Sequence, residues 1–107
     1  MSQHLFNTVY QDRPLQVMLG YDRPLGHVFM TLTYLDDGSS LYSNLDQPNA
    51  FDLSLDDYAA QLHHLGIGVP QSIFEETFLD AMFNEGNRFM THLPDGTYVP
   101  TVQEPQT

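Results

Sequence analysis

The sequence contains no cysteine, no lysine and no tryptophan, and it has no long apolar run. The absence of cysteine excludes disulfides, thiolate metal ligands and thiol nucleophiles. Apolar runs such as Val28-Phe29-Met30 fall far short of the roughly 18 residues that span a bilayer. The first residues show no basic region followed by an apolar stretch, so the sequence predicts no secretory signal and a cytoplasmic location.

Positive charge is scarce, because three arginines stand against 14 carboxylates and give a net charge of −11 at pH 7. Residues 36–85 carry seven aspartates and three glutamates without a single arginine, whereas residues 1–35 are neutral. A surface of this sign repels phosphate backbones and anionic lipids. The sequence therefore predicts no direct nucleic-acid binding, no membrane binding, and a basic or neutral protein partner. The alternative is that the acidity serves only solubility.

The length of 107 residues suits one domain with one core. We expect this domain to cover residues 1–99, followed by a mobile C-terminal tail at residues 100–107.

The first part of the chain reads as strands. The apolar run at 5–10 and the alternating run at 15–19 predict a hairpin, and the β-forming run at 27–34 predicts a third strand. A turn at 36–39 allows a short fourth strand at 41–43, and residues 88–92 predict a last strand with a short extension at 98–99.

Two helices are expected between these strands. Ser54 and Asp57 form a capping-box pattern before the first helix, which Gly66 ends. Ser72 and Glu75 repeat that pattern before a second helix that ends at Gly86. In this second helix we expect apolar side chains including Phe78, Leu79 and Met82 to face the sheet. The predicted fold class is α+β, with an antiparallel sheet of about four to five strands and two helices packed on one face.

One short pattern occurs twice, as Asp12-Arg13-Pro14-Leu15 and Asp22-Arg23-Pro24-Leu25. Proline stiffens each copy and the aspartate can close a turn on a nearby N–H. Each copy could simply start a strand. The functional interpretation is that Tyr21, Asp22 and Arg23 form an exposed recognition patch, because tyrosine and arginine are favoured at interaction hot spots.

The stretches 20–25 (GYDRPL), 29–30 (FM), 42–45 (YSNL), 65–67 (LGI) and 69–70 (VP) resemble a family of small uncharacterised bacterial proteins. The family pattern has Gly-Tyr/Trp-Asp-Arg-Pro-Leu and Tyr-Ser-Asn-Leu, and the resemblance runs from about Leu15 to His92. It implies a bacterial cytosolic origin, and it implies no established activity.

Metal and catalytic patterns are weak. His63 and His64 are adjacent, so on a helix they diverge, while His4, His27 and His92 are single. The carboxylate pairs Asp56-Asp57 and Glu75-Glu76 are typical of the solvent-facing side of a helix in its first turn. The sequence therefore predicts neither a metal nor a cofactor.

Serine, histidine and aspartate all occur, yet no Gly-x-Ser-x-Gly elbow exists. The leading hypothesis is a non-catalytic protein-interaction module, so the chain is not expected to be an enzyme. The alternatives are an acidic nucleic-acid mimic or inhibitor that occupies a basic groove of a partner protein, and a small ligand-binding protein or enzyme. A homodimer would also bury exposed aromatic side chains at a sheet edge. The predicted interaction residues are Tyr21, Asp22, Arg23, Asp56, Asp57, Glu75, Glu76 and Asp80.

Overall fold

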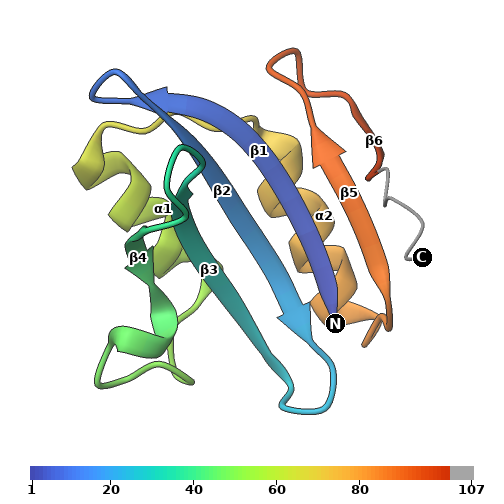
Figure 1. Ribbon diagram of the computed structural model, residues 1–107. Coiled ribbons are helices and arrows are strands. Elements are labelled where there is room, and N and C mark those ends of the chain that lie inside the picture. Colours follow the sequence, from blue (N-terminus) through green and yellow to red (C-terminus); the bar gives the residue numbers. More distant parts are fainter. Residues whose placement is uncertain (102–107) are drawn as a thin grey trace, which may run out of the picture.

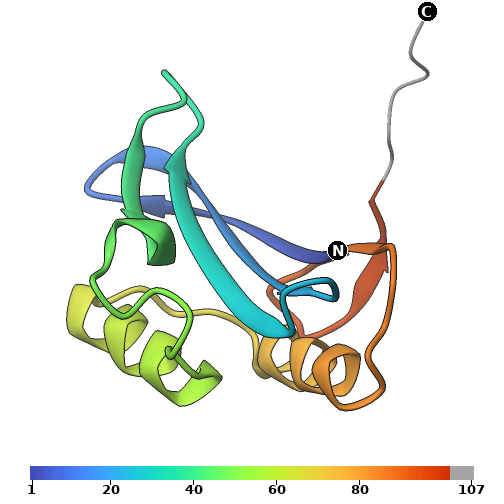
Figure 2. The ribbon, with the colours of Figure 1, turned by 90° about the horizontal axis from the view of Figure 1, so that it is seen from below.

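A computed structural model describes residues 1–101 as a six-stranded sheet with two helices on one of its faces (Figure 1). The view in Figure 2 places both helices on the same side of the sheet and leaves the other face open. The strands are β1 (Ser2–Tyr10), β2 (Arg13–Asp22), β3 (His27–Tyr34), β4 (Ser40–Ser43), β5 (Arg88–His92) and β6 (Tyr98–Pro100). The helices are α1 (Leu55–Leu65), α2 (Gln71–Met82) and the short 3-10 helix η1 (Asn44–Asp46).

The strand order is β4-β3-β2-β1-β5-β6, and the sheet is mixed. Neighbouring strands are antiparallel except β1 and β5, which pair in parallel from Ser2↔Arg88 to Leu5↔Thr91. The α+β class with two helices and a mostly antiparallel sheet is confirmed, and the sheet differs from the predicted four to five antiparallel strands by having six strands and one parallel pair. A parallel pair needs a long crossover, and the helical layer supplies it by returning the chain beside β1.

The hairpins form where turn chemistry predicts them. Gln11 and Asp12 both have positive φ (51° and 64°) and make the two-residue turn between β1 and β2. In the next turn Gly26 N–H donates to the carbonyl of Asp22 (2.7 Å), and the Asp22 carboxylate accepts from Leu25 N–H (3.3 Å). The expected turn-closing role of this aspartate is therefore confirmed.

Helix α1 follows its sequence signals. Ser54 Oγ accepts from Asp57 N–H (3.3 Å), the Asp57 carboxylate accepts from Ser54 N–H (2.8 Å), and Gly66 ends the helix with φ 75°. The helix buries Tyr58 and Leu62, and the Tyr58 hydroxyl donates to the carbonyl of Val28 (2.9 Å). This contact fixes α1 over β3.

The N-terminal cap of helix α2 and the side of the helix that is buried both differ from the prediction. Pro70 is its N-cap and no side chain caps it, so the predicted capping pair of Ser72 and Glu75 is wrong. The buried positions are Ile73, Thr77 and Asp80.

The residues expected to face the sheet from α2 are instead exposed. Phe78, Leu79 and Met82 have exposed fractions of 52%, 38% and 59%. Thr77 and Asp80 occupy the buried side of α2, where each has a hydrogen-bond partner. Thr77 donates to the carbonyl of Ile73 (2.7 Å), and Asp80 accepts from strand residues. The expectation that Phe78 is a core residue is therefore wrong.

The described core contains residues from β1, β2 and β3 packed on both helices. Its buried members are Phe6, Leu15, Val17, Leu19, Met30, Leu32, Tyr58, Leu62, Ile67 and Ile73. No helix of residues 1–101 has the length and apolarity required to cross a bilayer. In the predicted tail, Pro100 belongs to β6 and Thr101 N–H donates to the carbonyl of Phe89 (3.0 Å). Residues 102–107 lie outside the described part of the chain.

Candidate interaction surface

The outer side of α2 carries a row of large apolar side chains. Phe78 and Met82 are one helical turn apart, as are Leu79 and Phe83, so the four side chains adjoin one another. Phe83 directly follows the helix and is 69% exposed. Exposed apolar residues usually occur singly, and a contiguous group marks an interaction surface. We call Phe78, Leu79, Met82 and Phe83 the apolar row.

A groove between α1 and α2 continues from this row. Its volume is about 360 Å³, and its lining residues are Leu55, Asp56, Ala59, Gln71, Phe74, Glu75 and Phe78. Phe78 belongs to both features, which makes the row and the groove one surface. Asp56 and Glu75, both exposed, come from opposite walls of the groove. The combination is an apolar floor between carboxylates.

The predicted acidic residues divide into two groups. Asp56, Asp57 and Glu75 are exposed, and Asp57 also serves the α1 cap. Asp80 is only 2% exposed, so its expected place on the acidic surface is wrong. Glu76 is partly buried with it, because both carboxylates bind Arg88.

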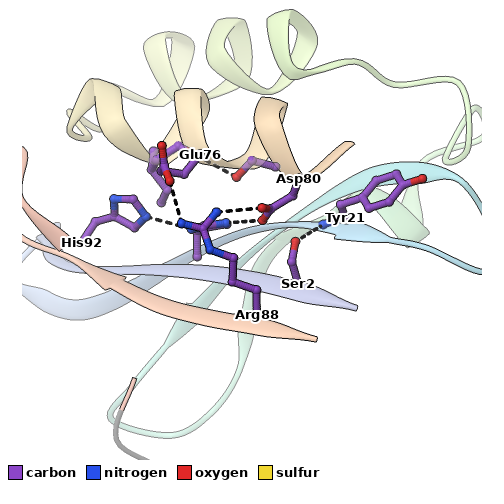
Figure 3. Close-up of polar contacts among 9 residues, drawn as sticks. Ser2, Tyr21, Glu76, Asp80, Arg88 and His92 are labelled. Atoms are coloured by element: carbon purple, nitrogen blue, oxygen red, sulfur yellow. Dashed lines mark hydrogen bonds and ion pairs between the residues drawn. The ribbon is translucent and has the colours of Figure 1, made fainter. Parts of the chain in front are cut away.

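Arg88 connects these two carboxylates to β5 (Figure 3). Its Nη1 donates to Asp80 Oδ1 (2.8 Å) and its Nη2 donates to Glu76 Oε1 (2.7 Å). The other carboxylate oxygen of Asp80 accepts from His4 Nε2 (2.6 Å). Burial alone would raise the pKa of Asp80, but the hydrogen bonds from His4 and Arg88 outweigh it and lower that pKa. Asp80 is therefore a carboxylate.

Two histidines that look isolated in the sequence meet inside the protein. His4 Nδ1 lies 2.9 Å from His92 Nε2, and His92 Nδ1 lies 2.8 Å from the Ser72 hydroxyl. Because ionised Asp80 can only accept, His4 Nε2–H must donate to it, which leaves Nδ1 of neutral His4 as an acceptor. His92 then donates to His4 through Nε2–H and accepts from Ser72. We call Ser72, His92, His4 and Asp80 the histidine relay.

Burial keeps both imidazoles of the relay neutral. Burial lowers the pKa of His92 to about 4. Burial also lowers the pKa of His4, and this effect exceeds the opposing influence of Asp80. The relay ties α2 to β1 and β5, and sequence reasoning missed it because no local pattern joins residues so far apart in the chain. The signal in the sequence was a histidine, His4, two residues before Phe6 and therefore on the same face of its strand.

The predicted recognition patch at 21–23 is only partly exposed. Tyr21 is 7% exposed, and its hydroxyl donates to Asn84 Oδ1 (2.7 Å). Its N–H donates to Ser2 Oγ (3.1 Å), as Figure 3 shows. An exposed role for Tyr21 is therefore wrong. Asp22 is partly buried and Arg23 is exposed, so recognition by Arg23 stays a prediction.

The matching arginine of the repeat has a local role. Arg13 binds Asp36 through two hydrogen bonds (2.9 and 2.8 Å), and its guanidinium lies 3.7 Å from the centre of the Tyr34 ring. The two copies of the repeat thus differ in what their arginines contact.

Among residues 1–101, no group of three or more His, Asp or Glu side chains is arranged to hold a metal ion. Comparison with models of known protein families, with curated proteins and with solved structures finds no match.

Proposed function

We propose that the chain is a non-catalytic protein-interaction module that binds a basic amphipathic segment of a partner protein. The apolar row of α2 is the observation that carries this proposal. A helix that exposes two phenylalanines, a leucine and a methionine side by side leaves a large apolar area in water. Covering that area with another protein would stabilise the complex.

Charge selects the kind of partner. Asp56 and Glu75 line the groove from opposite sides, and neither α1 nor α2 contains an arginine. An apolar helix face bordered by lysine or arginine would complement both features. A second copy of the chain would instead bring two net charges of −11 together, which opposes a homodimer through this surface.

A synthetic Leu/Lys helix of about 18 residues, with apolar residues at helical spacing, is the probe. Its binding is measured by fluorescence anisotropy against a Leu/Glu helix of the same pattern. We expect binding of the Leu/Lys helix only. The Phe78→Ser variant should weaken it at least about tenfold, or about 1.4 kcal/mol.

A matched control distinguishes binding at the apolar row from nonspecific hydrophobic binding. Val9→Ser removes another exposed apolar side chain, 67% exposed on β1, and should leave binding unchanged. Both variants should melt within about 3 °C of the parent protein, since exposed positions contribute little to stability. Equal weakening by the two variants, or equal binding of the Leu/Glu helix, would refute the proposal.

The same variants test the nucleic-acid mimic. A mimic binds through carboxylates, so Asp56→Asn should weaken it, Phe78→Ser should not, and its affinity should fall steeply with salt. If the partner instead binds the apolar row, Phe78→Ser should weaken binding more than Asp56→Asn does.

The histidine relay supports a second candidate function, a serine hydrolase with Ser72 as nucleophile. Ser72 donates to His92, and a second imidazole links His92 to Asp80, which extends the nucleophile, base and carboxylate order of such enzymes. Attack by Ser72 would pass its proton to His92 Nδ1. Transfer of the His92 Nε2 proton to His4 Nδ1 would then place the resulting positive charge on His4, beside Asp80. A fluorophosphonate probe should label the protein and not Ser72→Ala if this function holds. An unlabelled protein would leave the relay with a structural role.

A further inference from the structure

The open face of the sheet carries a pocket that the proposed function does not use. Its volume is about 340 Å³, which lies in the range of about 300–1,000 Å³ of small-molecule sites. Met18 on β2 and Phe29 on β3 lie on the open face, and Leu45 and Phe51 come from the segment after β4. The pocket and the apolar row therefore lie on opposite faces of the protein.

Two local features fix the walls of this pocket. Gly20 pairs with Phe29 across the strands, and a Cβ there would lie 2.2 Å from the Ser2 carbonyl oxygen and 2.4 Å from Phe29 Cζ. Glycine thus allows the Phe29 ring to lie across β2. Asn44 holds the other wall, since its Oδ1 accepts from Met30 N–H (3.3 Å) and its Nδ2 donates to the carbonyl of Ala50 (3.4 Å).

The pocket also contains a polar atom without a partner. His27 lines the pocket and meets the Phe51 ring edge-on, with ring centres 4.8 Å apart. Its Nδ1 is buried and has no hydrogen-bond partner among residues 1–101. Buried nitrogens are nearly always paired, so an orphan beside a pocket indicates an absent partner.

The charged groups around the pocket indicate which ligands it favours. Among residues 1–101, Asp22 is the only acidic side chain that lines the pocket, and no arginine lines it. One Asp22 oxygen caps the following turn, and the negative charge of the whole chain adds to its field. An anion is disfavoured here, whereas a cation beside a carboxylate and two phenyl rings is favoured.

We propose that this pocket binds a small uncharged or cationic molecule with a compact aromatic or aliphatic body and one hydroxyl or amino group. The body fills the space between Met18, Phe29 and Phe51. The polar group pairs with His27, and a positive charge is further held by Asp22.

Three compounds with the same ring test this class. Benzyl alcohol, benzylamine and benzoate are titrated into ¹⁵N-labelled protein, and backbone and imidazole shifts are followed by NMR. We expect benzyl alcohol and benzylamine to shift the amides of Phe29, Thr31 and Leu45 and the ring nitrogens of His27. Benzylamine should bind most tightly, and benzoate at least about tenfold more weakly than benzylamine.

Two variants assign the roles. His27→Phe should keep the edge contact with Phe51 and reduce benzyl alcohol binding to that of toluene. Asp22→Asn keeps the turn-capping oxygen and should lower the affinity for benzylamine to that for benzyl alcohol. The control variant Asp95→Asn, in the turn before β6, should change the affinity for neither compound. Absence of shifts at the pocket, benzoate binding as tightly as benzylamine, or a His27→Phe variant that binds benzyl alcohol normally would each overturn the proposal.

Discussion

The Asp80→Ala variant is expected to lose about 3–5 kcal/mol of unfolding free energy, the range for removing one partner of a buried ion pair. Asp80 is 2% exposed and binds both His4 and Arg88. Its removal leaves the His4 Nε2–H and one Arg88 nitrogen without an acceptor in the interior. Stability of this size is a large part of what a small domain has, so the variant should be barely folded at 37 °C.

Urea unfolding followed by circular dichroism measures this loss. Glu85→Ala is the matched control, because Glu85 is an exposed carboxylate in the loop after α2. It should change stability by less than about 0.5 kcal/mol. Similar losses for both variants would show that the Asp80 contacts do not hold the fold together.

Acidification is expected to destabilise the protein between pH 6.5 and about 4. Burial lowers the pKa of His92 from 6.5 to about 4. In this window the unfolded chain binds a proton at His92 and the folded chain does not, so stability rises with pH and is lost as pH falls. The shift corresponds to about 3 kcal/mol, and the lowered pKa of His4 acts in the same direction.

The groups facing His92 are Ser72, His4, Tyr98 and, more distantly, Glu76 and Arg88. The lowered pKa of Asp80 affects stability in a lower pH range. The stability that it contributes is lost only as the pH falls below the ordinary aspartate pKa of 3.8.

The His92→Gln variant isolates the histidine effect. A glutamine can accept from Ser72 and donate to His4 without titrating, so its stability should fall much less between pH 6.5 and 4. Thermal melts across this range provide the measurement. The same loss in both proteins would place the titration elsewhere.

Local signals in the sequence predicted most of the elements correctly. The strand at 27–34 and the strand at 88–92 were predicted with the bounds that the structure has, and Ser54, Asp57 and Gly66 were predicted as the caps of α1. These features depend on neighbouring residues, so the sequence contains them directly. The parallel pairing of β1 with β5 depends on contacts between the two ends of the chain, and no local pattern reports it.

The orientation of α2 was missed for a related reason. Apolar periodicity places Phe78 and Met82 inward, because an apolar stripe normally faces the core. The structure turns Thr77 and Asp80 inward instead, since Asp80 finds His4 and Arg88 there. The exposed apolar row and the residues that α2 gives to the histidine relay thus lie on different sides of one helix, and neither arrangement could be predicted while the apolar stripe was expected to face the sheet.

The most direct test of the proposed function is the location of the bound Leu/Lys helix on the protein. Amide shifts of ¹⁵N-labelled protein during titration with this peptide would map the contact. We predict that the largest shifts lie in α1 and α2, at residues around Asp56, Ala59, Phe74 and Phe78, and extend to Phe83. Shifts centred on the 22–26 turn or the open face of the sheet, or spread evenly over all exposed carboxylates, would contradict the account.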